Sequence, residues 1–137
     1  MKIVVFGASE IGLLVANEFF ENHDVTIIDK EENRSDSINR LDIRFIAGNG
    51  SNINTLLSAK IEDADIFIAC TTFDEANIVA CLTVSRMSNA KTVCFVSTPE
   101  YIESLQLGRY RDMNSLALNQ PPPEYFQPLR LFPPTTR

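Results

Sequence analysis

The sequence predicts an α/β fold: a doubly wound parallel sheet of five to six strands with helices on both faces. Short apolar runs, which are typical of parallel strands buried on both faces, alternate with segments whose apolar residues recur at helical spacing. Such alternation is the pattern of an α/β sheet with helical crossovers. The chain has 137 residues, of which 45% are hydrophobic, so it can bury the core of one domain.

A helix separates the first two predicted strands. Residues 3–6 (Ile-Val-Val-Phe) form the first apolar run, and residues 25–28 (Val-Thr-Ile-Ile) form the second, which ends at Asp29. Between them, residues 11–20 carry apolar side chains at helical spacing. We expect Asn22 to end this helix, because asparagine tolerates the left-handed backbone conformation.

The middle of the sequence predicts a third strand and a short helix. Residues 31–41 are polar and weakly helical, and residues 44–47 (Arg-Phe-Ile-Ala) resume the strand pattern. The strand is broken by residues 48–50 (Gly-Asn-Gly). Ser51 or Asn52 can then cap a helix that reaches about residue 59, because both side chains accept hydrogen bonds from free backbone N–H groups.

Two more strand and helix pairs follow. Residues 66–69 (Ile-Phe-Ile-Ala) and residues 92–96 are the fourth and fifth strands. Thr72 with Glu75 three positions later has the spacing of a capping box, which predicts a helix that extends to about residue 87. Thr98-Pro99 has the order of an N-cap and a first helical residue, so a further helix is predicted to start there.

The composition changes near the C-terminal end. Residues 113–118 carry a weaker signal for a sixth strand, and six of the seven prolines lie in residues 121–137. Proline-rich segments without periodicity favour extended or disordered chain. We therefore expect a compact domain over residues 1–119 and a proline-rich tail over residues 120–137.

Charge, cysteine content and hydropathy exclude several classes of protein. A net charge of −6 argues against a nucleic-acid partner. Cys70, Cys81 and Cys94 form no close pair, so we expect buried thiols rather than a metal site or disulfides. No apolar run approaches the ~18 residues of a membrane helix. We expect a cytoplasmic protein, which a partner could hold at the inner face of a membrane.

The main chemical signal is Gly7-Ala8-Ser9-Glu10-Ile11-Gly12, which lies between the first strand and the first helix in the position of a G-x-G-x-x-G turn. In a Rossmann-like fold, such a turn presents a helix N-terminus to a phosphate. Asp29 stands where such folds carry a ribose-binding acid, although Lys30 beside it could tolerate a 2′-phosphate. Ser9 replaces the middle glycine, so a turn that serves packing alone is the alternative interpretation.

Several blocks of residues in order resemble the RCK/KTN (TrkA N-terminal) domain family. The blocks are residues 1–12, 23–29, 48–51 (Gly-Asn-Gly-Ser), 63–65 (Asp-Ala-Asp), 71–77 (Thr-Thr-Phe-Asp-Glu-Ala-Asn) and 99–101 (Pro-Glu-Tyr). The resemblance implies a Rossmann-like fold that regulates a potassium channel or transporter. It also implies binding of NAD(H), ATP, ADP or AMP, assembly into homodimers or larger homo-oligomers, and a membrane subunit as partner.

The resemblance also implies a role for each matching residue. It places Gly7, Ser9 and Gly12 at the phosphates, Asp29 at the adenosine ribose, Asn49, Gly50 and Ser51 near the adenine, Thr71 and Thr72 at the pocket edge, and Asp74 and Asn77 at the next helix start. Thr72, Asp74 and Glu75 have another interpretation, because they can cap a helix and complement its dipole. Glu10, in the first turn of the phosphate-binding helix, should oppose anionic ligands.

The leading hypothesis is a regulatory nucleotide-binding domain without catalysis. One alternative is the cofactor-binding domain of an NAD(P)-dependent oxidoreductase, and another is an assembly module that no longer binds nucleotide. The sequence has one histidine, His23, and neither a Tyr-x-x-x-Lys pair nor a Gly-x-Ser-x-Gly elbow. We therefore expect no enzymatic activity.

Overall fold

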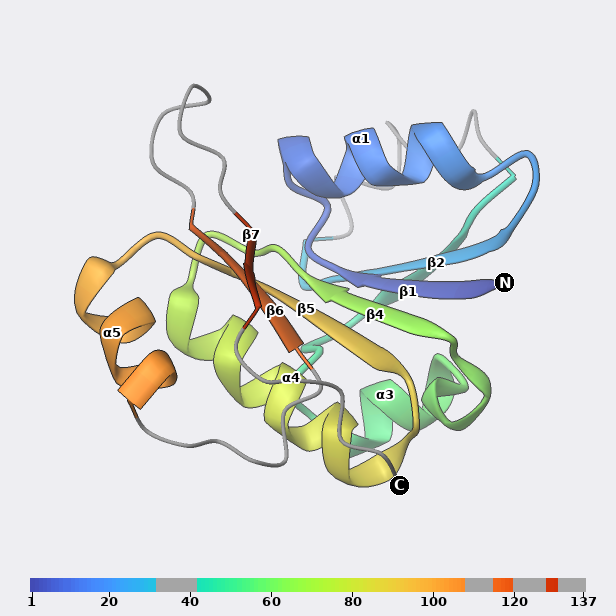
Figure 1. Cartoon of the computed structure of the whole chain (residues 1–137). Coiled ribbons are helices and arrows are strands. Elements are labelled where there is room, and N and C mark those ends of the chain that lie inside the picture. The colour runs from blue at the N-terminus through green and yellow to red at the C-terminus, as the bar shows by residue number, and fades with distance from the viewer. Residues whose placement is uncertain (32–41, 108–114, 120–127, 131–137) are drawn as a thin grey trace.

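The computed structural model describes residues 1–31, 42–107, 115–119 and 128–130. One sheet runs through the molecule in the order β3-β2-β1-β4-β5-β6-β7, with every pair parallel except β6 and β7 (Figure 1). The strands are β1 (Lys2–Phe6), β2 (Asp24–Asp29), β3 (Arg44–Ala47), β4 (Ile66–Ala69), β5 (Lys91–Val96), β6 (Ser115–Asn119) and β7 (Pro128–Arg130).

Helices cover both faces of this sheet, as Figure 1 shows. Helix α1 lies on one face, whereas α3, α4 and α5 lie on the other (Figure 1). The helices are α1 (Glu10–Phe19), α3 (Ile53–Ser58), the 3₁₀ turn η2 (Ile61–Asp63), α4 (Asp74–Met87) and α5 (Pro99–Leu107). The doubly wound α/β fold predicted from the sequence is therefore confirmed. No helix in the described ranges has the length and apolar character needed to cross a bilayer.

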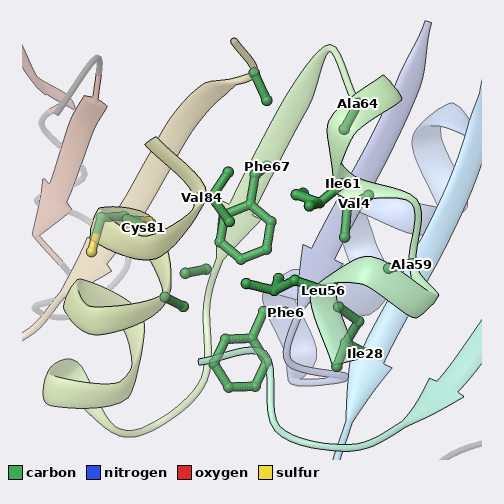
Figure 2. Packing of buried hydrophobic residues seen from close by; sticks show 14 of the residues in the cluster. Val4, Phe6, Ile28, Leu56, Ala59, Ile61, Ala64, Phe67, Cys81 and Val84 are labelled. Atoms are coloured by element: carbon green, nitrogen blue, oxygen red, sulfur yellow. The ribbon is translucent and has the colours of Figure 1, made fainter. Parts of the chain in front are cut away.

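The core explains why the strands read as unbroken apolar runs. Val4 and Phe6 of β1 pack toward α3 and α4, while Ile3 and Val5 of the same strand pack toward α1. Figure 2 shows the first of these layers, where the ring of Phe67 lies among side chains from β1, α3 and α4. Each fully buried side chain of this size contributes about 1.5–3 kcal/mol of hydrophobic free energy. The three cysteines are free and buried, as expected.

Two helix boundaries differ from the sequence-based predictions. Asn22 was expected to be left-handed, but among the described residues only Gly7 and Lys60 have a positive φ. Helix α1 instead ends in a turn whose N–H groups at Asn22 and His23 both donate to the Phe19 carbonyl. The end of α1 therefore requires no left-handed residue.

The predicted capping box at the start of α4 is also wrong. Helix α4 begins at Asp74, and its N-cap residue, Phe73, makes no side-chain capping bond. Glu75 does not reach back to Thr72, because its carboxylate accepts a 2.6 Å hydrogen bond from the Tyr101 hydroxyl. By contrast, Asn52 caps α3 through its side chain as predicted.

The C-terminal strands extend the sheet beyond the five clearest strands of the sequence. The weak signal for a sixth strand is confirmed by β6, which pairs in parallel with β5. Strand β7 lies within the residues expected to form an extended or disordered tail, and it pairs antiparallel with β6. Proline at the first position of a short edge strand is compatible with this pairing. The weakly helical prediction for residues 31–41 falls, apart from Glu31, outside the described residues.

Candidate functional site

A pocket of about 120 Å³ opens at the carboxyl ends of β1, β2 and β4. Open α/β sheets hold ligands at the point where the strand order reverses, and here that point lies between β1 and β4. The pocket is lined by Phe6, Gly7, Ser9, Asp29, Lys30, Glu31, Thr71, Thr72, Phe73 and Ala76. The structure thus brings together six of the residues predicted for binding.

The two motif glycines allow the close approach of β1, α1 and β4. Gly7 has a φ of +115°, and a Cβ there would lie 2.9 Å from the Thr71 nitrogen. A Cβ on Gly12 would lie only 1.9 Å from the Gly7 carbonyl oxygen. Gly7 therefore lines the pocket, whereas Gly12 lets the first turn of α1 pack onto the loop that precedes it.

Ser9 explains how this turn works without its middle glycine. The Ser9 hydroxyl donates a 2.8 Å hydrogen bond to the Cys70 carbonyl and accepts a 3.2 Å bond from the Gly12 N–H. It therefore caps α1 and ties the turn to the end of β4. Within the described residues, the N–H groups of Glu10 and Ile11 have no hydrogen-bond partner. Unpaired N–H groups in the first turn of a helix suit an anion.

The carboxylate of Asp29 is held in a fixed orientation by the backbone. One oxygen accepts a 2.7 Å hydrogen bond from the Ala8 N–H, and the other accepts a 2.9 Å bond from the Glu31 N–H. A carboxylate has about four acceptor positions, so two remain for a ligand. Asp29 therefore connects the glycine turn to the end of β2 while it keeps capacity for a pair of ligand hydroxyls.

The loop between β3 and α3 shapes the pocket indirectly. Asn49, Gly50 and Ser51, which the resemblance placed near the adenine, do not line the pocket. The Asn49 side chain accepts hydrogen bonds from the N–H and hydroxyl of Ser51, which stabilise the turn. A Cβ on Gly50 would lie 2.4 Å from the ring of Phe6, which does line the pocket. Gly50 thus allows the loop to pack against Phe6.

Asn77 is a buried link between three segments. Its side-chain oxygen accepts hydrogen bonds from the Thr71 N–H (3.0 Å) and the Thr71 hydroxyl (2.6 Å). Its amide nitrogen donates to the carbonyls of Thr71 (3.0 Å) and Phe95 (2.8 Å). Asn77 therefore holds the loop after β4 against the end of β5, and its side chain does not reach the pocket.

Asp74 makes a second link between the same two loops. Its carboxylate accepts hydrogen bonds from the N–H and hydroxyl groups of both Ser97 and Thr98. Burial alone would raise the pKa of Asp74, but these hydrogen bonds outweigh burial and lower its pKa below 3.8. Asp74 and Asn77 do lie at the start of α4 as predicted, yet their contacts are with the protein.

The pocket contains four residues that sequence reasoning missed: Phe6, Glu31, Phe73 and Ala76. Glu31 and Phe73 could have been found, because each lies shortly after the carboxyl end of a strand beside the switch point. Phe6 and Ala76 carry no such signal, since their apolar side chains fit the periodicity of a buried strand and a helix.

The histidine and the cysteines of the chain are not among the residues that line the pocket. His23 directly precedes β2, so it lies at the amino-terminal ends of the strands, whereas the pocket lies at their carboxyl ends. Its Nδ1 is 3.2 Å from the amino group of Met1. Cys70 is close to the glycine turn, but burial raises the pKa of its thiol to about 12, so it is protonated at neutral pH.

Strand order, glycine turn and pocket together define a Rossmann-like α/β domain with a pocket at the switch point. The model of the TrkA-N domain family matches residues 3–111, and the chain belongs to this family. This finding confirms the family resemblance given by the sequence blocks.

Relatives with this domain carry potassium-uptake names. The chain is 40% identical over 111 residues to Trk system potassium uptake protein trkA homolog 1 of Methanosarcina mazei. The aligned region covers 76% of this chain and 27% of that protein. It is 39% identical over 108 residues to the Trk system potassium uptake protein TrkA homolog of Methanothermobacter thermautotrophicus, and the aligned region covers 77% of this chain and 50% of that protein. The chain thus spans about a quarter to a half of the length of these curated relatives.

Solved structures share the fold at low sequence identity. The TrkA-N domain of the inner membrane protein ybaL from Escherichia coli superposes with a TM-score of 0.74 at 13% identity, covering 86% of each chain. The Kef CTD of Shewanella denitrificans in its AMP-bound form gives 0.66 at 14% identity, over 80% of this chain and 69% of that one. The GsuK channel bound to NAD superposes with a TM-score of 0.64 at 19% identity, over 77% of this chain and 20% of that one.

Proposed function

We propose that this chain is a regulatory nucleotide-binding domain of a potassium-transport system and that it works without catalysis. The observation that carries the proposal is the Asp29 carboxylate, fixed by the N–H groups of Ala8 and Glu31 beside the glycine turn. A ribose fits there, because a carboxylate accepts both of its hydroxyls, and the first turn of α1 accepts the phosphates. The names of the TrkA relatives support the potassium-transport context.

The ligand in this proposal is NAD(H) or an adenine nucleotide (ATP, ADP or AMP). The solved structures that share this fold include the AMP-bound Kef CTD and the GsuK channel bound to NAD, which supports this class of ligand. Asp29 and Glu31 put two carboxylates at the ribose end of the pocket, so a 2′-phosphate should be disfavoured despite Lys30. We therefore expect NADH to bind more tightly than NADPH.

Calorimetry with ADP and NADH tests the proposed site. Asp29→Ala should cost about 1.5–3 kcal/mol of affinity, because it removes a charge-assisted, bidentate contact. The matched control is Glu62→Ala, which removes an exposed carboxylate on η2, outside the pocket. Circular dichroism of Asp29→Ala is needed to show that the turn still folds without its two acceptors. Equal affinity of folded Asp29→Ala and wild-type protein would contradict the proposed site.

The proposal of no turnover follows from the chemistry of the pocket. Its ionisable side chains are Asp29, Lys30 and Glu31, without a histidine or thiol to transfer protons at neutral pH. The purified chain should neither hydrolyse ATP nor oxidise NADH with carbonyl acceptors above the buffer rate. A rate that disappears when one pocket residue is replaced would contradict this expectation and favour the oxidoreductase alternative.

The partners in this proposal are a second copy of the chain and the membrane subunit of a potassium channel or transporter, which would place the domain at the cytoplasmic face. Light scattering should give a mass of at least twice the 15.4 kDa of one chain at micromolar concentration. Only monomer under these conditions would count against self-association.

A further inference from the structure

Phe73 is an exposed aromatic ring at the mouth of the pocket. It is 68% exposed, the largest exposed fraction among the large hydrophobic side chains of the described residues. It also lines the pocket, unlike the exposed Leu14, Ile53, Leu57 and Val79. A phenylalanine ring in water loses the free energy that burial would provide, so its position beside a ligand pocket calls for a physical explanation.

The backbone beneath this ring is held by hydrogen bonds. The Phe73 N–H donates to the Thr71 hydroxyl at 3.2 Å, and that hydroxyl donates its one proton to the Asn77 side-chain oxygen at 2.6 Å. The Phe73 carbonyl accepts a 3.1 Å bond from the Asn77 N–H, in the first turn of α4. The Cα of Phe73 is therefore fixed, and a ligand that contacts the ring orders only two side-chain torsions.

The residues that line the pocket opposite Phe73 indicate which part of a nucleotide would contact this ring. Asp29, Lys30 and Glu31 line the β2 side, and Thr71, Thr72 and Phe73 line the β4 side. In a nucleotide the base is bonded directly to the ribose. A ribose held by Asp29 therefore leaves its base close by, between these two walls. Phe6 lines the pocket too, but it is 2% exposed and presents little of its ring.

We propose that the Phe73 ring stacks on the adenine of the bound nucleotide and thereby selects ligands that carry a large aromatic base. This inference rests on the proposed nucleotide binding and assigns its base contact to one side chain. Stacking of a base on an aromatic side chain does not depend on the hydrogen-bond pattern of the base. It therefore contributes affinity without hydrogen bonds to the donor and acceptor groups of the base.

A fluorescence experiment tests the contact directly, because the sequence contains no tryptophan. In Phe73→Trp, the single indole reports on its own surroundings. Titration with ADP should change its emission in a saturable way, with the dissociation constant that calorimetry gives. The matched control is Val79→Trp on α4, the helix that Phe73 precedes; this side chain is 49% exposed and outside the pocket, and its emission should not respond. The absence of a response from Phe73→Trp at saturating ADP would overturn the inference.

Affinities separate stacking from general apolar contact. Phe73→Ala should weaken ADP about tenfold, and Phe73→Leu should recover little of that loss, because leucine lacks a π face. If wild-type protein binds ADP and Asp29→Ala weakens it while Phe73→Ala does not, nucleotide binding stands and stacking is wrong. If wild-type protein binds no nucleotide, both proposals fail. Loss of self-association in Phe73→Ala at unchanged affinity would also overturn the inference and assign the ring to a contact between copies.

Discussion

Replacing Asn77 with alanine removes a buried amide that supports one wall of the pocket. The side chain is fully buried, and its two donor and two acceptor positions are all used, three by Thr71 and one by Phe95. Alanine would leave the Phe95 carbonyl and two backbone groups of Thr71 without these partners, together with a small void. We expect Asn77→Ala to destabilise the domain and to loosen the loop that carries Phe73.

The expected magnitude follows from the number of groups that lose a hydrogen bond to Asn77. A buried polar group that loses its partner costs about 1–3 kcal/mol. Three such groups would give up to about 9 kcal/mol, but Thr71 is only half-buried, so water can replace part of the loss. We therefore expect about 3–5 kcal/mol, a large part of the 5–15 kcal/mol typical of a domain.

Urea denaturation at neutral pH measures this loss, with Thr83→Ala as the control. Thr83 also bonds to a backbone carbonyl on α4, but on an exposed surface, so its replacement should change the free energy of unfolding by less than about 0.5 kcal/mol. Asn77→Asp keeps the shape of the side chain but replaces the amide nitrogen, which donates to the carbonyls of Thr71 and Phe95, with an oxygen. That oxygen would face two carbonyl oxygens, so this variant should destabilise the domain as well. A loss below about 1 kcal/mol for Asn77→Ala would refute the structural role assigned to this amide.

Three further outcomes are expected. Asp74→Asn should cost about 1–3 kcal/mol at pH 7; because the pKa of Asp74 is lowered, its stabilisation is present above 3.8 and is lost as the pH falls below that, so acid denaturation curves of the two forms should converge there. Gly50→Ala should destabilise by about 1–3 kcal/mol in urea, because its Cβ would lie 2.4 Å from the Phe6 ring, and Gly48→Ala should cost less, since its nearest neighbour is the rotatable side chain of Thr55. Glu10→Gln should tighten ADP binding up to about fivefold at low salt and less at high salt, because Glu10 is exposed in the first turn of α1; calorimetry showing weaker binding would contradict this.

The parts of the fold that the sequence predicted are those governed by local pattern. The apolar runs of β1, β2 and β4 are recognisable because strands buried on both faces carry mostly apolar side chains, with Thr26 of β2 as a buried polar exception. Gly7 and Asp29 were identified because a tight turn and a carboxylate at a strand end have chemical requirements that few residues meet. Both residues line the pocket, and their contact with a ligand stays a prediction.

What the sequence could not reveal are contacts between residues far apart in the chain. The spacing of Thr72 and Glu75 fits a capping box, yet Glu75 bonds to Tyr101, which lies 26 positions later. Asp74 likewise bonds to Ser97 and Thr98, 23 and 24 positions away. No periodicity encodes such pairs, because they depend on how β4 and β5 lie side by side in the sheet.

Residues 71–77 contain side chains that stabilise the protein by inward hydrogen bonds and one exposed ring that faces the solvent. Thr71, Asp74 and Asn77 bond inward to backbone and side chains, whereas Phe73 points outward on a backbone that those bonds hold. Replacing an inward residue should therefore change stability and ligand affinity together, since the wall itself moves. Replacing Phe73 should change affinity while the free energy of unfolding stays within about 0.5 kcal/mol, because an exposed ring has little packing to lose. Urea denaturation and ADP calorimetry on Phe73→Ala and Asn77→Ala measure both quantities, and a large loss of stability in Phe73→Ala would show that the ring belongs to the core of the wall.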